Sequence, residues 1–328
     1  MERSPKVDVT AAQLGARLRD GDLAAAPAVL NVVENRAPER RAQVTALLGE
    51  VSPARLGGEA RAHVIGITGP PGAGKSTLLS ALVGAWRAAG RSVAVLAVDP
   101  TSKRSGGALL GDRARIAHDP GDPAVFIRST AAGDRLGGLA PATRAAAQAL
   151  AAAFDIVVVE TVGVGQSETE VAEVADTVTV IVQPGSGDAL QFLKSGIMEI
   201  PDVLVVTKAD LGSIAQRAAG DLRAALRSTG AGATRVVAVS SLPPVTGIDE
   251  LIVALDAHRA GLDLPARRRA ARQAGALADF TVEHGEHGVR ALGGRRAARA
   301  FLATQDEALD GAALMTQLER RATETATS

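Results

Sequence analysis

The chain contains the stretch Gly69-Pro70-Pro71-Gly72-Ala73-Gly74-Lys75-Ser76, which matches the phosphate-loop pattern G-x-x-x-x-G-K-[ST] at every fixed position. An apolar run at 63–67 precedes it and another at 77–83 follows it, so the pattern lies between a predicted strand and a predicted helix. Glycines let backbone N–H groups close around a polyphosphate, and the positive end of the following helix points at the same anion. We therefore expect Gly69–Thr77 to bind a nucleotide, with Lys75 neutralising the β- and γ-oxygens and Ser76 holding Mg²⁺.

The composition narrows the possible classes of function. Lys and Arg total 36, and so do Asp and Glu, so no net charge favours nucleic acid or an anionic membrane as a partner. The absence of cysteine excludes disulfides, thiolate metal sites and cysteine nucleophiles. With five Phe, one Trp and no Tyr, an aromatic platform for single-stranded bases is not expected. No secretory leader and no apolar run of about 18 residues is seen, so we expect a cytoplasmic protein.

Seven short apolar runs follow one another between helical segments. They are rich in β-branched residues and do not alternate with polar ones, which is typical of strands covered on both faces. We therefore predict an α/β fold, a doubly wound and mostly parallel sheet of about seven strands of the P-loop NTPase type, with helical extensions at both ends. The predicted strands are His63–Ile67, Val93–Val98, Val125–Ile127, Ile156–Val159, Val178–Val182, Val203–Val206 and Val236–Val239.

The chain is expected to have three parts: an N-terminal helical arm at 1–60, the nucleotide domain at 61–258 and a C-terminal helical region at 259–328. The last part carries Arg267-Arg268-Arg269, which we interpret as a helix face or a partner surface rather than a nucleic-acid arm. It also carries Glu283-His284-Gly285-Glu286-His287-Gly288. The two histidines suggest a metal site, but this spacing without a third ligand in view is more typical of a solvated loop.

Ligands of doubly wound sheets lie at the carboxyl ends of the strands, where three acidic residues are found. Asp99 follows the strand that ends at Val98, Asp112 lies beyond it, and Glu160 follows the strand Ile156–Val159. A polyphosphate repels a carboxylate unless a cation lies between them, so we expect Asp99, Asp112 and Glu160 to face Mg²⁺ or its waters. Asp99 could instead cap a turn before a proline.

The residues after Glu160 are glycine-rich and suit a nucleotide-sensing segment. Gly163 could donate its N–H to a γ-phosphate, a contact that only a triphosphate provides. Gln166 could orient the attacking water or only hydrogen-bond within its loop, and Glu160 could also position that water. Residues 183–194 form a further segment, whose charges could reach the nucleotide or a partner or could lie on a plain surface loop.

The choice of base is predicted by Thr207-Lys208-Ala209-Asp210, which follows the strand Val203–Val206. The carboxylate of Asp210 can accept hydrogen bonds from the ring N–H and the exocyclic amine of guanine, and adenine has neither donor at these positions. The stem of Lys208 would cover the face of the base. After the last strand, Ser240 and Ser241 are placed to contact the guanine carbonyl through backbone N–H groups.

Together these motifs resemble the MeaB/ArgK-type accessory GTPases of the SIMIBI class, from about residue 21 to residue 247. The resemblance rests on Val33-Glu34-Asn35-Arg36, the phosphate loop, Val98-Asp99-Pro100, Gly111-Asp112-Arg113, the string Glu160-Thr161-Val162-Gly163-Val164-Gly165-Gln166-Ser167-Glu168, and Gly196-Ile197-Met198-Glu199-Ile200. It departs from the family at Thr207, where many members have Asn, and at Ser240-Ser241-Leu242, where Ser-Ala is more usual. The change at Thr207 is expected to weaken affinity for the base without changing its choice.

The resemblance implies a Mg²⁺-dependent GTPase that cycles between GTP and GDP. It implies that the protein guards an adenosylcobalamin-dependent acyl-CoA mutase, usually methylmalonyl-CoA mutase, and gates its cofactor loading. It also implies that the C-terminal helices form a homodimer and that Asp188 and Lys194 belong to a third switch. Two other functions stay open: a metal-insertion GTPase of the nickel-chaperone type, and a kinase of an amino-acid transport system.

Overall fold

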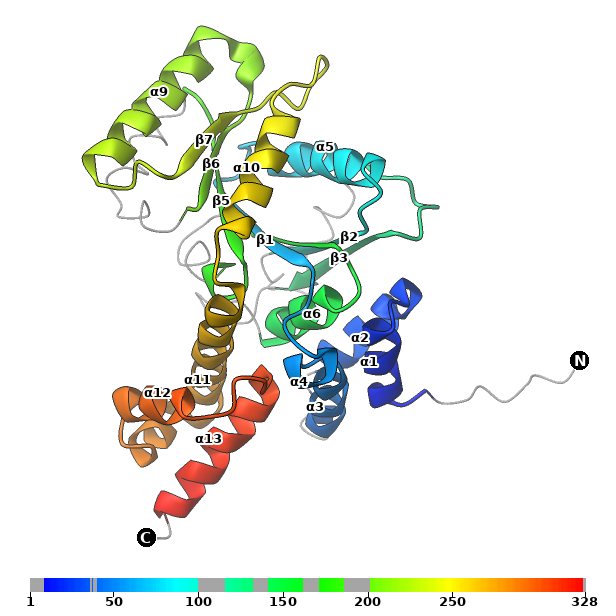
Figure 1. Ribbon diagram of the computed structural model, residues 1–328, viewed down its shortest axis with the longest axis vertical. Helices are drawn as coiled ribbons and strands as arrows, with labels where there is room; N and C mark the ends of the chain where they lie inside the picture. Colours follow the sequence, from blue (N-terminus) through cyan, green and yellow to red (C-terminus); the bar gives the residue numbers. More distant parts are fainter. Residues whose placement is uncertain are drawn as a thin grey trace, which may run out of the picture. The chain divides into compact units, whose positions relative to one another are not determined.

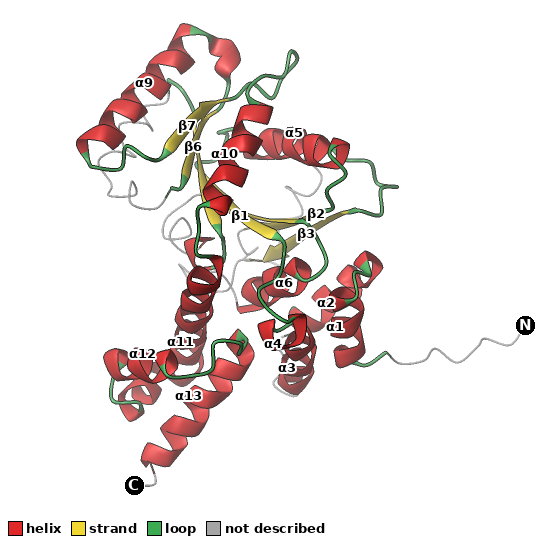
Figure 2. Cartoon of the chain, in the orientation of Figure 1, coloured by secondary structure: helices red, strands yellow, loops and turns green. Residues whose placement is uncertain are grey.

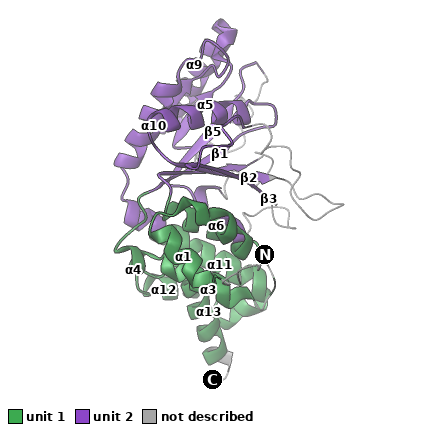
Figure 3. Cartoon of the chain, turned by 90° about the vertical axis from the view of Figure 1, so that its right-hand side faces the viewer, with its two compact units in different colours: residues 1–61, 144–153, 269–328 green, residues 62–143, 154–268 purple. Residues whose placement is uncertain are grey.

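The computed structural model describes residues 9–35, 37, 40–99, 116–131, 141–161, 171–185 and 201–326. The chain divides into two compact units, which Figure 3 shows in different colours. Unit 1 combines residues 1–61, 144–153 and 269–328, and unit 2 combines residues 62–143 and 154–268. Both ends of the chain therefore share a unit with a short segment from its middle. The three-part division drawn from the sequence stays a prediction.

Unit 2 is built on a seven-stranded sheet in which every neighbouring pair of strands is parallel (Figure 1). The strand order is β3-β2-β4-β1-β5-β6-β7, so β1, which leads into the phosphate loop, is central. The predicted α/β class is confirmed. The strands are β1 (His63–Thr68), β2 (Val93–Asp99), β3 (Val125–Ala131), β4 (Ile156–Thr161), β5 (Thr177–Val182), β6 (Val203–Val206) and β7 (Arg235–Ala238).

One face of this sheet packs against two helices. Side chains alternate along a strand, so Ile65 and Ile67 of β1 lie on the same face. They join Leu82 and Trp86 of α5 and Leu251 of α10 in one buried cluster, where Trp86 is 1% exposed. Among the described residues of unit 2 are the helices α5 (Lys75–Ala88), α9 (Ser213–Ser228) and α10 (Ile248–Ala260) and the short 3-10 turns η4 (Val171–Glu173) and η6 (Ala209–Leu211).

A chain of polar side chains lies at the amino ends of β1 and β5. His63 is 1% exposed, and its Nε2 lies 2.8 Å from Oγ1 of Thr177. The same hydroxyl lies 2.9 Å from Nδ1 of His258 on α10, whose Nε2 lies 3.1 Å from Asp202. Burial lowers the pKa of His63 to about 4, against a smaller opposing effect of the Asp176 charge. The ring of His63 is therefore neutral near pH 7.

The basic triplet lies on helix α11 (Leu264–Ala291) and its guanidinium groups are engaged within the chain. Arg268 donates two hydrogen bonds, of 2.8 and 2.7 Å, to Asp176, which is 1% exposed. Arg267 lies 3.2 Å from Asp202, and Arg269 pairs with Glu307 in unit 1. A buried carboxylate needs such a partner, because burial without one disfavours its charge.

The regular elements in the described part of unit 1 are all helices, which loops connect (Figure 2). Phe280, Leu302 and Leu318 belong to its buried core. Among the described residues of both units, no helix is long and apolar enough to cross a bilayer. The helices are α1 (Ala11–Arg19), α2 (Ala26–Val33), α3 (Arg41–Glu50), α4 (Pro53–Leu56), most of α6 (Pro141–Ala151), α11 from residue 269, α12 (Arg295–Ala303) and α13 (Gly311–Ala326), with the 3-10 turn η1 (Leu23–Ala25).

The segment with His284 and His287 lies within α11, so the prediction of a loop is wrong, although both histidines are exposed to solvent as expected. Only Gly285 in it has non-helical dihedral angles, with φ 64°. Phe280, Gly288 and Val289 are buried on either side of this kink. Two helical segments of α11 therefore meet at Gly285, and buried residues pack on both sides of the kink.

Candidate nucleotide site

The phosphate loop joins the end of β1 to the first turn of α5, as the sequence predicts. Gly69 has φ 150°, and a Cβ added there would lie 2.5 Å from the carbonyl oxygen of Ile181. Gly74 has φ 89° and precedes Lys75, the first residue of α5. Neither position accepts a larger residue without strain, because positive φ and close backbone contact both favour glycine. The loop therefore needs glycine to approach β5 and to turn into the helix.

Lys75 lies over the loop itself. Its side chain is 8% exposed, and its Nζ donates to the carbonyl oxygens of Gly69 at 2.8 Å and Pro70 at 3.2 Å. Ser76, which is half-buried, follows in the first turn of α5. A cation and a helix N-terminus thus point at the same place, which is the arrangement that binds phosphate groups.

Glu160 reaches the carboxyl edge of the sheet beside the phosphate-loop strand. It pairs with Ile67 of β1 on one side and with Ala97 of β2 on the other, and it is 3% exposed. Asp99 is the last residue of β2, two residues beyond Ala97, and only its backbone is described. The hydroxyl of Ser76 and the carboxylate of Glu160 are oxygen donors of the kind Mg²⁺ prefers, so these residues fit the ion.

Three further predicted site residues lie outside the described residues: Asp112, Gly163 and Gln166. The same holds for Asp188 and Lys194 of the expected third switch. Their roles stay predictions.

The base-reading loop, our name for the predicted segment Thr207–Asp210, follows the end of β6. The N–H of Thr207 donates to Val182 at 3.1 Å, and Lys208 then takes a left-handed conformation with φ 54°. This turn leads into η6, which carries the exposed Asp210. The hydroxyl of Ser240 lies 3.3 Å from Oδ1 of Asp210. The exits of two neighbouring strands thus bring Asp210 and Ser240 together.

The two predicted serines differ in what they can offer. The N–H of Ser240 donates to the carbonyl of Thr246 at 3.0 Å, and the N–H of Thr246 donates back to Ser240 at the same distance. The N–H of Ser240 is therefore engaged in a bridge, and its hydroxyl can donate to the carbonyl of Leu242 at 3.1 Å or to Asp210 at 3.3 Å. Of the two backbone N–H groups predicted to contact a guanine carbonyl, that of Ser240 is already used. Ser241, which is half-buried, stays the candidate for this contact.

One link between the two loops was missed by sequence reasoning. The hydroxyl of Thr207, a residue that is 3% exposed, donates to the carbonyl of Ala73 at 2.7 Å. Thr207 also lies close to Gly74. A Cβ added to this glycine would lie 3.9 Å from the Cβ of Thr207. A buried hydrogen bond therefore ties the base-reading loop to the phosphate loop. No local signal in the sequence pairs these residues, which are 134 positions apart.

Comparison with known proteins agrees with these motifs. The family described as "Methylmalonyl Co-A mutase-associated GTPase MeaB" matches residues 26–289. A Pyrococcus horikoshii protein that is named as a GTPase is 50% identical over 195 residues, which cover 59% of this chain and 59% of that protein. The "Methylmalonic aciduria type A homolog, mitochondrial" of Caenorhabditis briggsae is 39% identical over 234 residues, 68% of this chain and 54% of its own. The chain thus spans just over half the length of these relatives.

A solved structure gives the same fold over nearly the full chain. The crystal structure of an LAO/AO transport system kinase superposes with a TM-score of 0.65 and 29% sequence identity, covering 99% of this chain and 100% of that one. The similarity therefore includes the helical segments as well as the sheet.

Proposed function

Because this chain belongs to the MeaB family of methylmalonyl-CoA mutase-associated GTPases, we propose that it binds and hydrolyses GTP with Mg²⁺ and serves an adenosylcobalamin-dependent acyl-CoA mutase. The observation that carries the nucleotide part is the hydrogen bond of 2.7 Å between Thr207 and Ala73. It joins a phosphate loop and a guanine-reading loop at one edge of one sheet. A single nucleotide can therefore reach both.

In this proposal the phosphate chain lies over Gly69–Gly74, and Lys75 exchanges its carbonyl acceptors for the β- and γ-oxygens. Carbonyl oxygens are weaker partners for an ammonium group than charged phosphate oxygens, so the exchange is favourable. Ser76 and Glu160 hold Mg²⁺ or its waters, with Asp99 and Asp112 as further candidates. When bound, Mg²⁺ would neutralise negative charge on the phosphates while the γ-phosphoryl group is transferred to water. Gly163 and Gln166 keep their predicted roles near the γ-phosphate and the attacking water.

The base is read by Asp210. Its carboxylate only accepts hydrogen bonds, and it is supported by the hydroxyl of Ser240. Guanine offers the two donors that such a carboxylate requires, and adenine does not. A transport-system kinase, which is how the solved relative is named, would use ATP in the usual case and is therefore the weaker alternative for this chain.

The mutase partner is supported by the family description and by the name of the nematode relative. Gating of cofactor loading, formation of a homodimer by the C-terminal helices and a cytoplasmic location belong to the same proposal. The alternative of a nickel-chaperone GTPase would need a metal transferred in a nucleotide-dependent way.

The test measures nucleotide binding and turnover by the purified full chain. We expect GTP and GDP to bind at least about a hundredfold more tightly than ATP, because a carboxylate that the bound base covers without donating to it costs on the order of 3 kcal/mol. Lys75→Ala should abolish hydrolysis. Asp210→Asn should shift preference from guanine toward xanthine, whereas Asp221→Asn, on the exposed face of α9, should change neither property.

Adding an adenosylcobalamin-dependent mutase to the same assay separates the two parts of the proposal. Stimulated GTP turnover is expected, because the partner completes the site. If GTP binds but its turnover does not change on addition of methylmalonyl-CoA mutase or a related acyl-CoA mutase, only the proposed partnership is contradicted. Equal affinity for ATP and GTP would contradict the nucleotide assignment itself.

A further inference from the structure

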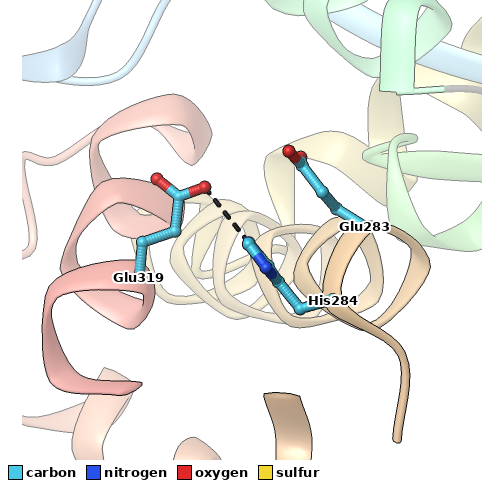
Figure 4. A group of neighbouring side chains, drawn as sticks. All are labelled: Glu283, His284 and Glu319. Carbon is cyan, nitrogen blue, oxygen red and sulfur yellow. Dashed lines mark hydrogen bonds and ion pairs between the residues drawn. The ribbon is translucent and has the colours of Figure 1, made fainter. Parts of the chain in front are cut away.

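Three side chains of unit 1 with metal-binding atoms converge between two helices. Glu283 and His284 lie on α11 and Glu319 lies on α13, and one ligand atom from each lies within 4.8 Å of the others. Figure 4 shows His284 and Glu319 facing each other, with the carboxylate of Glu283 beside them. The distance between Nε2 of His284 and Oε1 of Glu319 is 3.2 Å. Within the described residues, no other group of His, Asp and Glu meets this criterion.

A cation already lies at this point. The guanidinium of Arg41, on α3, pairs with Glu283 and also donates to Glu319 at 2.9 Å. Two carboxylates from different helices thus share one positive charge. The side chain of Arg41 is half exposed, so it can turn into solvent without leaving a cavity in the core.

The imidazole of His284 is held in place by the helix beneath it. Its ring centroid lies 4.5 Å from that of Phe280, which is buried. Its Cβ lies so close to Gly288 that a Cβ added to the glycine would be only 2.4 Å away. A ligand fixed by packing loses little freedom when it binds, which favours a specific site.

We propose that Glu283, His284 and Glu319 form a binding site for a divalent transition metal, and that Arg41 occupies it until the metal displaces it. One imidazole and two carboxylates suit Zn²⁺ or Ni²⁺, and the imidazole disfavours Mg²⁺ and Ca²⁺. Because the site is exposed, water or a fourth ligand from another molecule completes the coordination. The proposal does not depend on the nucleotide site of unit 2.

The chain supplies its own matched controls. The sequence repeats Glu-His one turn later as Glu286-His287, on the same helix and also exposed. Glu286 pairs with Arg295 and not with α13. His287 is not part of the cluster. Substitutions in the second pair therefore change the same residue types without touching the proposed ligands.

The experiment is titration of the full-length protein with Zn²⁺, and separately Ni²⁺, in buffer with excess Mg²⁺. We expect one metal ion per chain, weakened at least about tenfold by His284→Gln or Glu319→Gln and unchanged by His287→Gln or Glu286→Gln. Arg41→Gln should tighten binding by about tenfold, because it removes the competing cation. Co²⁺ should give a visible absorption band in the wild type that His284→Gln abolishes.

Three results would overturn the proposal: no stoichiometric Zn²⁺ or Ni²⁺ binding, equal loss in the His284 and His287 variants, or weaker binding after Arg41→Gln. The last would mean that Arg41 organises the carboxylates rather than competing for them. Circular dichroism of each variant checks that the helices remain folded, and the conservative Arg41→Lys, which keeps the charge, should not tighten binding.

Discussion

The buried histidine of β1 predicts a pH dependence that can be worked out in advance. His63→Gln removes the titrating ring and keeps a side-chain amide near Thr177. The pKa of His63 is about 4 in the folded chain and 6.5 is its ordinary value. At pH values between these two pKa values the unfolded chain therefore binds more protons than the folded chain. The folded chain loses stability as the pH falls through this range. At about pH 7 and above the contribution is fully present.

The size of the effect follows from the same two values. Between about pH 8 and about pH 5 the wild type should lose ~2 kcal/mol more unfolding free energy than His63→Gln, and ~3 kcal/mol by about pH 4. Because His63 is 1% exposed, solvent screening does not reduce this figure much.

Urea unfolding at a series of pH values measures the difference. Trp86 is the only tryptophan of the chain and lies in the core of unit 2, so its fluorescence reports on the unit that contains His63. His287→Gln, an exposed histidine of unit 1, controls for the loss of a histidine and should follow the wild type. A constant gap between wild type and His63→Gln from about pH 8 to about pH 5 would refute the reasoning.

Three further substitutions test the site and the core. Thr207→Val should weaken GDP binding about tenfold by leaving the Ala73 carbonyl without its donor, whereas Thr207→Ser should bind nearly normally in a calorimetric titration. Gly69→Ala should lower the free energy of unfolding by about 2 kcal/mol, because its Cβ would meet Ile181, while Gly84→Ala on α5, where nothing lies within 4 Å, should change stability by less than about 1 kcal/mol in chemical denaturation. Trp86→Ala should cost about 3–5 kcal/mol, measured by circular dichroism; a smaller loss would mean that the cluster of α5 and α10 collapses around the gap.

The seven strands could be predicted because parallel strands covered on both faces must be continuously apolar. The ends were harder to place where polar residues continue a strand. β3 extends through Arg128 and Thr130 to Ala131, beyond the predicted end at Ile127. The phosphate loop and the acidic strand end at Glu160 were predicted because each is a local pattern beside an apolar run.

Features that depend on distant residues could not be predicted. The strand order and the bond from Thr207 to Ala73 arise only when the sheet assembles. Thr207 stood out in the sequence merely as a replacement for Asn, yet its hydroxyl supplies a link between loops. The Gly-rich segment around His284 suggested a loop, because the glycines were visible and the buried face of α11 was not. Its partners Arg41 and Glu319 come from opposite ends of the chain.

The strand order places the proposed phosphate-side residues and the proposed base-side residues on opposite sides of β1. We call the strands on these two sides the first and the second flank. β4 and β2, with Glu160 and Asp99, lie on one side of β1, and β6 and β7, with Asp210 and Ser240, lie toward the other. In the proposed function the second flank holds the base, which is identical in GTP and GDP, so substitutions there should scale the affinities for both nucleotides by the same factor. The end of the phosphate chain that hydrolysis removes would lie at the phosphate loop after β1 and at the first flank. In the proposed function, a signal that distinguishes GTP from GDP would therefore start at the loops after β1, β4 and β2, or at the expected third switch after β5, and not at the loops that hold the base.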